Sequence, residues 1–349
     1  MTRKPKRLSS QAIMPQLTIC IPTYNRARFL RTTLNHLLKQ IRDWTSVQVL
    51  ISDNASTDET HSVVESFRKV HPALSYQCNE RNLGMDENAF RAIEAAAGTY
   101  VWLLSDDDIP LPGVFDEIMK NIAGANAGLL YLHVAGYWPG EPYDIVYGRT
   151  TVRPDKTYLD PEEALRELEI THFSAIIMKR SLALPHIPTV RGYAEKGFTR
   201  GYTVNVAHYV LLSSRKPCIF IGKLALACHN PQDGNNYNVL TTLIDSAREY
   251  QILRSHNLVS ARTEHTVLNA LVRGFYILVI PRRCNMDPHA SPEVLAEITR
   301  LYRPYRNYWL FLHPFVALPL WALRPLYLTA RTARRLIRSL SQTLRQGGA

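Results

Sequence analysis

The sequence lacks the cysteine patterns and phosphate-binding loops of several common classes of protein. Its five cysteines among 349 residues are odd in number and include no CxxC pair, so we expect neither a zinc cluster nor a disulfide framework. Reduced cysteines also favour a cytosolic compartment. No GxGxxG segment follows the first predicted strand, and no P-loop lysine motif is present. Any bound nucleotide must therefore be held without a glycine-rich loop.

Long apolar runs are also absent. Residues 1–14 form a basic tail, and no long apolar stretch follows it before Thr23, so we expect no export signal. The apolar stretch from Tyr308 to Leu323 is interrupted by prolines and is shorter than the roughly 20 residues that a membrane span needs. With 46% hydrophobic and 20% charged residues, the chain has the composition of a folded globular protein.

Acidic residues are absent after Glu297, whereas arginines continue almost to the end, and the net charge of the chain is +11. Within residues 306–349, arginines occupy one face of the last predicted helix and aliphatic residues occupy the other. We interpret residues 306–349 as an amphipathic, basic, membrane-associating segment that lies on anionic lipid. Nucleic acid is the alternative polyanion, and the last core helices of a globular domain are the structural alternative.

Short apolar runs alternate with helix-period segments from Leu17 to about Gly136, which predicts an α/β fold with a parallel sheet and flanking helices. The five predicted strands are Leu17–Ile21, Val47–Ser52, Leu74–Cys78, Tyr100–Leu104 and Gly128–His133. The third helix is expected from Asp86 to Ala97, closed by Gly98 in the left-handed conformation.

Beyond Gly136 the periodicity is weaker. Strands are predicted at Phe173–Met178 and Cys218–Ala227, and a helix is predicted at Pro161–Glu169. The segment from Thr241 to about Arg303 is predicted to be mostly helical.

Polar clusters follow four of the predicted strands, at the edge where parallel sheets bind ligands. The clusters are Pro22-Thr23-Tyr24-Asn25-Arg26, Asp53-Asn54-Ala55-Ser56-Thr57-Asp58, Asn79-Glu80-Arg81-Asn82-Leu83-Gly84 and Ser105-Asp106-Asp107-Asp108. The Asp53 carboxylate can accept a hydrogen bond from a nucleobase or a ribose hydroxyl. For Asp58, capping of the next helix is the preferred interpretation.

Three adjacent carboxylates, Asp106, Asp107 and Asp108, come directly after the fourth predicted strand. They repel one another unless a cation or another positive group neutralises them. Mg²⁺ or Mn²⁺ binds one or two protein carboxylates together with substrate phosphates, and stabilises the charge of a leaving diphosphate. The alternative is an acidic turn that caps a helix near Pro112.

These clusters together resemble a known family. Ile19–Arg26, Ile51–Asp58, Arg81–Gly84 and Leu104–Asp108 with Pro112-Gly113 are similar to the successive motifs of family 2 glycosyltransferases. Within the family they are most similar to abequosyltransferase-type members of bacterial surface polysaccharide synthesis. The resemblance implies the GT-A fold, a Rossmann-like nucleotide-binding sheet with flanking helices. We expect this domain at 15–232, with a nucleotide-sugar half at 15–136, an acceptor half at 137–232 and a helical region at 233–305.

The resemblance also implies a role for individual residues. The implied nucleotide-binding residues are Pro22, Thr23 and Tyr24 beside the base, Arg26, Asp53 on the base, Arg81, Asn82 and Gly84 in the nucleoside pocket, and Asp106 near the ribose. Asp107 or Asp108 would hold Mg²⁺ or Mn²⁺. Many family members have an aspartate where this chain has Ser105, so the choice of carboxylate stays open.

The family commonly supplies its catalytic base from a Glu-Asp pair, and no such pair lies between His172 and His229. An inverting transfer needs a base near the acceptor hydroxyl, and Glu195 and His208 are the candidates. For each of them an ordinary surface or core role is the alternative. His229 is a further candidate for contact with the diphosphate or the metal.

We therefore expect a glycosyltransferase that uses a UDP, CDP, GDP or TDP sugar and a glycan or lipid-linked acceptor. It would be cytoplasmic, peripherally associated with the inner face of the cell membrane, and would bind no nucleic acid. One alternative is a nucleotidyltransferase that makes sugar nucleotides, which would need a glycine-rich loop after the first strand. The other is a non-enzymatic basic protein that binds a membrane or nucleic acid.

Overall fold

The structure is a computed structural model that describes residues 14–124, 126–137, 153–168, 170–198, 202–229, 239–284, 290–325 and 327–329. The described chain divides into two compact units. The first holds the described residues up to Ala164, those of 170–196 and those of 202–229, and the second holds the rest. Most of the predicted basic tail and the arginine-rich end of the predicted membrane segment lie outside the described residues.

The first unit is built on a mixed sheet whose described strands follow the order β3-β2-β1-β4-β8-β6-β9-β5. Its first four strands are β1 (Leu17–Thr23), β2 (Val47–Asp53), β3 (Leu74–Cys78) and β4 (Tyr100–Leu103). These four strands run parallel to one another, so all four end at the same edge. This pairing confirms the predicted parallel sheet. The strands β1, β2 and β4 are mostly apolar and are buried on both faces.

Antiparallel pairs complete the sheet. The remaining strands are β5 (Ile109–Pro110), β6 (Leu129–Tyr137), β7 (Lys156–Tyr158), β8 (Ile176–Lys179) and β9 (Cys218–His229). β8 runs antiparallel to both β4 and β6, β6 runs parallel to β9, and β5 and β7 run antiparallel to β9. The end of β9 therefore lies close to the loop that joins β4 to β5.

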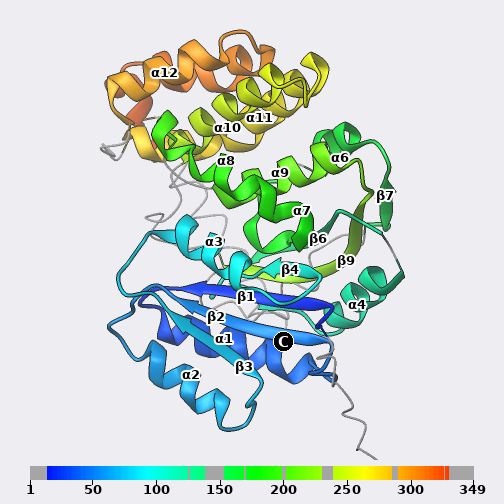
Figure 1. Cartoon of the computed structure of the whole chain (residues 1–349). Coiled ribbons are helices and arrows are strands. Elements are labelled where there is room, and N and C mark those ends of the chain that lie inside the picture. The colour runs from blue at the N-terminus through cyan, green and yellow to red at the C-terminus, as the bar shows by residue number, and fades with distance from the viewer. Residues whose placement is uncertain are drawn as a thin grey trace, which may run out of the picture. The chain divides into compact units, whose positions relative to one another are not determined.

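Helices cover both faces of this sheet (Figure 1). α1 (Ala27–Leu37) and α2 (Thr60–Arg68) lie on one face of β1–β3, and α3 (Met85–Ala95) lies on the other. This arrangement follows from the strand order, because right-handed crossovers place α1 and α2 together and the reversal after β3 places α3 opposite. The other described helices up to residue 229 are α4 (Val114–Gly124), α6 (Pro161–Leu168), α7 (Arg180–Ala183), α8 (Ile187–Arg191) and α9 (Tyr202–Ser214). The 3₁₀ turns in the same part of the chain are η1 (Leu38–Gln40), η2 (Phe173–Ala175), η3 (Leu184–His186) and η4 (Ala194–Lys196).

Two details of the prediction were wrong. Gly98 does not have a positive φ and is no left-handed cap. It is required because a Cβ there would lie 2.5 Å from the backbone nitrogen of Thr18. The strand predicted from Phe173 begins only at Ile176, because residues 173–175 form the 3₁₀ turn η2.

The second unit is helical, which confirms the helical prediction for the C-terminal region. Its helices are α10 (Val239–Ser255), α11 (Ala261–Cys284), α12 (Pro292–Tyr302), the π-helical turn η6 (Tyr308–Leu312) and α13 (His313–Ala317). Within the bundle, the hydroxyl of Tyr302 donates a hydrogen bond of 2.7 Å to the backbone oxygen of Leu243. Among the described residues no single helix is long and apolar enough to cross a membrane. The pair Tyr308–Ala317 and Leu320–Thr329, bent by 107°, has the required length and composition, and these are all that it shows.

Candidate functional site

The loops that follow β1, β2 and β4 meet at the carboxyl edge of the sheet. The Thr23 hydroxyl at the end of β1 donates a hydrogen bond of 2.7 Å to Oδ2 of Asp106 after β4. The backbone N–H of Asn54 after β2 donates to the carbonyl oxygen of Thr23 over 2.9 Å. Three of the polar clusters found in the sequence are therefore in direct contact, which is the arrangement that the parallel strands predicted.

Arg26 supplies the positive charge that the three aspartates require. Its Nη1 lies 3.2 Å from Oδ1 of Asp106, and its Nη2 forms a close ion pair with Oδ2 of Asp107. The guanidinium also lies 4.7 Å from the ring centre of Phe29. Burial alone would lower the pKa of Arg26, but the charges of Asp106 and Asp107 outweigh that effect and raise it.

Asp106 and Asp108 are buried carboxyl groups. Burial raises the pKa of Asp106 to about 7, with Arg26 acting in the opposite direction and Asp107 adding to the shift. Burial, and then the neighbouring charge of Asp107, raise the pKa of Asp108 to about 7 as well. Added positive charge at this edge would favour the ionised form of both groups.

Asp108 fixes the acidic loop to the end of β9. Its Oδ1 accepts a hydrogen bond of 3.0 Å from the backbone N–H of His229, and its carboxylate also accepts bonds from Ser174 and Cys228. The Thr33 hydroxyl of α1 lies 2.8 Å from the carbonyl oxygen of Asp106 and 3.1 Å from that of Asp108. The loop is therefore tied to α1, η2 and β9 together.

Asp107 is more exposed than Asp106, with 13% of its side chain accessible against 3%. The Ser105 hydroxyl donates to its Oδ1 over 2.5 Å, and Nδ1 of His229 lies 3.3 Å from its Oδ2. Ser105 stands where many family members have an aspartate, and it acts here as a donor to Asp107. Asp107 is thus the least buried of the three carboxylates.

His172 and Cys228 are two residues of this region that the sequence did not single out. Ligand atoms of Asp108, His172 and Cys228 all lie within 4.8 Å of one another. Burial lowers the pKa of His172, with Asp107 acting in the opposite direction, so its ring is neutral near pH 7. No local pattern could have found these residues, because they come from segments far apart in the chain.

Asp53 and Asp58 have different surroundings. The buried carboxylate of Asp53 accepts hydrogen bonds from the Ser56 N–H at 2.9 Å and from the Tyr76 hydroxyl at 2.8 Å. Asp58 accepts from the N–H of Thr60 and from the N–H of Ala27, at the first residues of α2 and α1. Asp58 thus bonds the first N–H groups of both helices, as the capping interpretation expected, although the N-cap position of α2 itself is Glu59. Asp53 also shapes the loop after β2.

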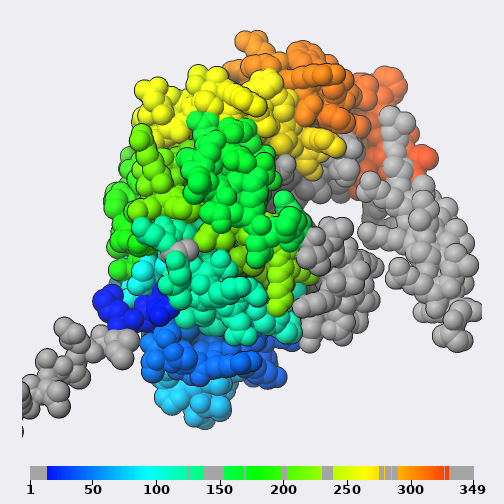
Figure 2. Space-filling model, turned by 90° about the vertical axis from the view of Figure 1, so that its right-hand side faces the viewer, coloured from blue at the N-terminus to red at the C-terminus, as the bar shows by residue number. Residues whose placement is uncertain are grey.

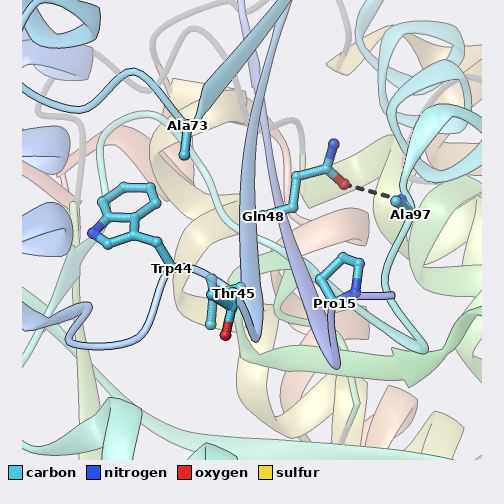
Figure 3. Close-up of a pocket in the computed structure, with 7 residues that line it drawn as sticks. Pro15, Trp44, Thr45, Gln48, Ala73 and Ala97 are labelled. Atoms are coloured by element: carbon cyan, nitrogen blue, oxygen red, sulfur yellow. Dashed lines mark hydrogen bonds between the residues drawn. The ribbon is translucent and has the colours of Figure 1, made fainter. Parts of the chain in front are cut away.

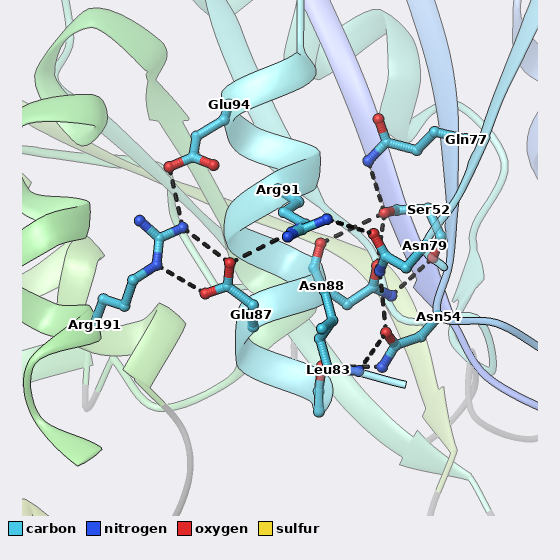
Figure 4. Close-up of polar contacts among 11 residues, drawn as sticks. Ser52, Asn54, Gln77, Asn79, Leu83, Glu87, Asn88, Arg91, Glu94 and Arg191 are labelled. Atoms are coloured by element: carbon cyan, nitrogen blue, oxygen red, sulfur yellow. Dashed lines mark hydrogen bonds and ion pairs between the residues drawn. The ribbon is translucent and has the colours of Figure 1, made fainter. Parts of the chain in front are cut away.

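An asparagine network holds the loop after β3 (Figure 4). Asn54 donates to Oδ1 of Asn82 over 2.7 Å and to the carbonyl oxygen of Gly84 over 3.1 Å. Asn79 donates to Asn54 and to Asn88 over 3.0 Å each. Gly84 has a φ of 87°, a conformation that favours glycine. Asn82 and Gly84 thus shape this loop from within.

The other predicted nucleotide contacts, like Asn82 and Gly84, are not buried. Tyr24 and Arg81 are exposed, and Pro22 is half-buried at the end of β1. Asn25, between Tyr24 and Arg26, accepts a hydrogen bond of 2.7 Å from the Thr57 N–H, which joins the loop after β1 to the loop after β2. These side chains therefore border the same edge as the acidic loop.

The two candidate bases differ sharply in accessibility. His208 on α9 is only 5% exposed, and its Nε2 lies 2.8 Å from the backbone oxygen of Ile170. Glu195 in η4 is exposed. The Glu195 carboxylate is therefore open to solvent, whereas the His208 ring is enclosed in the protein.

A hollow of about 590 Å³ lies at the opposite edge of the sheet (Figure 3). Its lining residues are Pro15, Trp44, Thr45, Val47, Gln48, Ala73 and Ala97. They precede or begin β1, β2, β3 and β4, so the hollow lies at the amino ends of the strands. Since ligands of parallel sheets bind at the carboxyl ends, this hollow is separate from the candidate site.

Comparison with known sequences agrees with the resemblance seen in the motifs. The model of the family described as glycosyl transferase family 2 matches residues 18–193. The abequosyltransferase RfbV of Salmonella typhimurium is 37% identical over 93 residues, covering 26% of this chain and 28% of that protein. The GalNAc(5)-diNAcBac-PP-undecaprenol beta-1,3-glucosyltransferase of Campylobacter jejuni is 32% identical over 124 residues, covering 35% and 38%. The matches thus span well under half of these relatives.

Solved structures share the fold over most of the chain. The crystal structure of Staphylococcus aureus TarS superposes with a TM-score of 0.56 at 16% identity, covering 95% of this chain and 92% of that one. The mannosyltransferase PcManGT from Pyrobaculum calidifontis, in complex with GDP-Man and Mn²⁺, gives 0.51 at 18% identity, covering 87% and 85%. At this low identity the likeness establishes the fold alone, and it confirms the predicted GT-A architecture.

Proposed function

Because the chain belongs to glycosyl transferase family 2, we propose that it transfers a sugar from a nucleotide-sugar donor to a glycan or lipid-linked acceptor. The observation that carries the proposal is the meeting of Thr23, Arg26 and the three aspartates at one edge of the sheet. A donor there would have polar loops around its nucleoside and a carboxylate beside its diphosphate. The nucleotidyltransferase alternative is not favoured, because no glycine-rich loop follows β1.

We propose that the nucleoside binds along the loops after β1, β2 and β3. Exposed Tyr24 and half-buried Pro22 support contact with the base, and exposed Arg81 supports contact with the nucleoside. Asp106, whose Oδ2 already accepts from Thr23, would face the ribose. Asp53, Asn82 and Gly84 already form hydrogen bonds within the protein, so we propose that they shape the nucleoside pocket. Arg26 is cationic and so suits the diphosphate.

The carboxylate oxygens at this edge are suitable ligands for a hard divalent ion such as Mg²⁺ or Mn²⁺. Asp107 would hold it, with Asp108 and His229 close by. A bound ion of this kind would stabilise the negative charge that develops on the leaving diphosphate. The fit rests on the oxygen ligands that the three adjacent carboxylates offer, and the pKa of Asp106 stays raised to about 7 even with Arg26 beside it. The complex of PcManGT with GDP-Man and Mn²⁺ supports the same class of ion.

The choice of catalytic base rests on the solvent exposure of the two candidate side chains. Glu195 is exposed, whereas His208 is buried and its ring nitrogen faces a backbone oxygen. We therefore assign proton abstraction from the acceptor hydroxyl to Glu195 and a structural role to His208.

The acceptor is proposed to be part of a bacterial surface polysaccharide, assembled on a lipid carrier. The names of the Salmonella and Campylobacter relatives support this, since one is an abequosyltransferase and the other acts on a substrate linked to undecaprenol. A further solved structure of TarS contains UDP-GlcNAc. These names leave UDP, CDP, GDP and TDP sugars all as candidate donors.

A peripheral position on the cytoplasmic face of the membrane is part of this proposal. In the second unit, Trp309, Leu310, Trp321 and Leu328 are exposed, and Trp321 has 80% of its surface accessible. The part of the second unit from residue 290 to residue 329 is coloured orange to red in Figure 2. Exposed tryptophan beside Arg303, Arg306 and Arg324 is a combination typical of proteins that lie on anionic lipid.

The test is calorimetric titration of the whole chain with UDP, CDP, GDP and TDP, with and without Mn²⁺. We expect one nucleotide to bind in the presence of the ion and the Asp107→Asn variant to weaken that binding at least about tenfold, with unchanged circular dichroism. Asp116→Asn, on the exposed side of α4, is the matched control and should bind as the native protein does. Equal nucleotide affinity in the Asp107→Asn variant would refute the assigned site.

A further inference from the structure

Three potential metal ligands of different chemistry converge beside the acidic loop. Asp108 lies in the loop after β4, His172 directly precedes η2, and Cys228 is the penultimate residue of β9. Their ligand atoms lie within 4.8 Å of one another. Since the three residues are separated by more than fifty positions in the sequence, only the folded sheet brings them together.

One ring nitrogen of His172 has no hydrogen-bond partner among the described residues. This atom, Nδ1, is buried. A buried polar atom left without a partner costs about 1–3 kcal/mol, so its position needs an explanation, and a bound ion is one. Asp108 and Cys228, by contrast, are joined by a hydrogen bond from the thiol to the carboxylate.

We propose that Asp108, His172 and Cys228 bind a divalent ion of the zinc class, in a site distinct from the Mg²⁺ or Mn²⁺ position at Asp107. One sulfur, one nitrogen and one oxygen ligand suit Zn²⁺ or Co²⁺, whereas Mg²⁺ takes oxygen ligands. Three protein ligands also leave a tetrahedral ion its fourth position for water.

The geometry requires only a small adjustment. The ligand atoms of a tetrahedral zinc ion lie about 3.5 Å from one another. Side-chain shifts of about 1 Å would bring the three ligand atoms, now within 4.8 Å of one another, to that separation. On binding, the Cys228 thiol would lose its proton to solvent, and the ion would replace the hydrogen bond that the thiol now donates to Asp108. The ion would then tie the acidic loop to η2 and β9, and so fix the position of Asp107.

The test uses Co²⁺ as a spectroscopic probe on the full chain, stripped with a chelator and free of nucleotide. A cobalt ion bound by a thiolate gives a strong near-ultraviolet charge-transfer absorption that oxygen ligands do not give. We expect this band to saturate at one equivalent, to disappear in Cys228→Ser and to be displaced by Zn²⁺. Cys218→Ser on the same strand and exposed Cys78→Ser are the controls that should keep it.

A second variant covers the case in which Cys228→Ser does not fold. His172→Gln should keep the fold and weaken Co²⁺ binding at least about tenfold, since one of three protein ligands is lost. No band in the native protein, or a band of equal strength in Cys228→Ser, would overturn the proposal.

This proposal rests on the proposed function for its setting, but the absence of the zinc-class site and the absence of nucleotide binding give different results. Nucleotide binding with Mn²⁺ is measured separately, and Cys228→Ser should retain it. Asp107→Asn should lose nucleotide binding and keep the cobalt band. Loss of the band in Asp107→Asn would show a single shared ion and overturn the separate site.

Discussion

Arg26 and a divalent cation would neutralise the same carboxylate. In the structure, the guanidinium of Arg26 is paired with both Asp106 and Asp107 and rests against Phe29. The sequence predicted that the aspartates need a positive group, but it placed Arg26 only among the nucleotide contacts. An ion at Asp107 must therefore compete with Arg26, or Arg26 must turn toward the diphosphate when the donor binds.

Replacing Arg26 by Gln should expose this competition. Without metal, the variant should lose about 1–3 kcal/mol of unfolding free energy, because buried Asp106 loses its ion-pair partner and must take up a proton or stay charged and unpaired. Added Mn²⁺ should then raise the melting temperature more in the variant than in the native protein. Differential scanning calorimetry with and without Mn²⁺ measures both effects. Arg28→Gln, an exposed neighbour on α1, is the control, and equal Mn²⁺ shifts in all three proteins would contradict the competition.

The site residues differ in how far the sequence could reveal them. Asp106, Asp107 and Asp108 are adjacent in the chain and follow an apolar strand, so their repulsion is evident from the sequence alone. His172 and Cys228 meet Asp108 only through the order of β4, β8, β6 and β9, which no local pattern contains. The burial of His208 was likewise invisible, because α9 carries apolar residues around most of its circumference.

At the scale of elements, the backbones of β1 and of the turn before β4 approach very closely at Gly98. The Gly98 N–H donates to the Thr18 hydroxyl over 2.7 Å, and an added Cβ would lie 2.5 Å from the Thr18 nitrogen and 2.7 Å from the Leu17 carbonyl carbon. Because both of these atoms belong to the backbone of a central strand, they cannot move aside independently.

Gly98→Ala should therefore lower the unfolding free energy by about 1–3 kcal/mol. Gly124→Ala, at the end of α4, should leave the unfolding free energy unchanged or raise it by up to about 1 kcal/mol. A Cβ added there would meet no atom within 4 Å. Urea denaturation of both variants measures the difference. A Gly98→Ala variant as stable as Gly124→Ala would contradict the close approach.

Glu297 joins α10 to α12 in the second unit. Its carboxylate accepts hydrogen bonds from Arg300 at 2.7 Å and from Arg248 at 3.1 Å. The hydrogen bond from Arg300, with that from Arg248, lowers the pKa of Glu297 to about 2 from its ordinary value of 4.5. Because the folded value lies below the unfolded value, the stabilisation is present above about pH 4.5 and is lost as the pH falls toward 2.

Glu297→Gln should therefore lower the stability of the second unit by about 1–2 kcal/mol at neutral pH, after allowance for solvent screening of a partly exposed pair. The deficit should shrink as the pH falls below 4.5. Urea denaturation of both proteins at several pH values measures it. A deficit that stays constant between pH 7 and pH 3 would contradict the assigned ionisation.

The elements themselves were predicted unevenly, for physical reasons. β1 and β2 are apolar runs bounded by polar clusters, so their positions were found to within two residues. β7 has only three residues, too few to show a period of two, and was missed. β8 was placed too early because Phe173 and Ala175 extend the apolar run of the strand into η2.

For the whole molecule, the exposed aromatic residues of the second unit predict binding to anionic lipid. Trp309→Ala with Trp321→Ala should reduce co-sedimentation with phosphatidylglycerol vesicles roughly tenfold or more, since two large apolar side chains no longer enter the interface. Leu159→Ala, an equally exposed apolar residue of the first unit, is the control. Preference for DNA over vesicles would instead favour the nucleic-acid alternative.

The central claim is that an ion at Asp107 accompanies the nucleotide at the carboxyl edge of the sheet. The most direct measurement is the anomalous scattering of manganese in crystals grown with Mn²⁺ and the nucleoside diphosphate that binds best. The account predicts a peak in contact with a carboxylate oxygen of Asp107 and with the diphosphate, and Arg26 no longer paired to that oxygen. A bound nucleotide with no manganese peak at Asp107, or a nucleotide bound away from this edge, would contradict it.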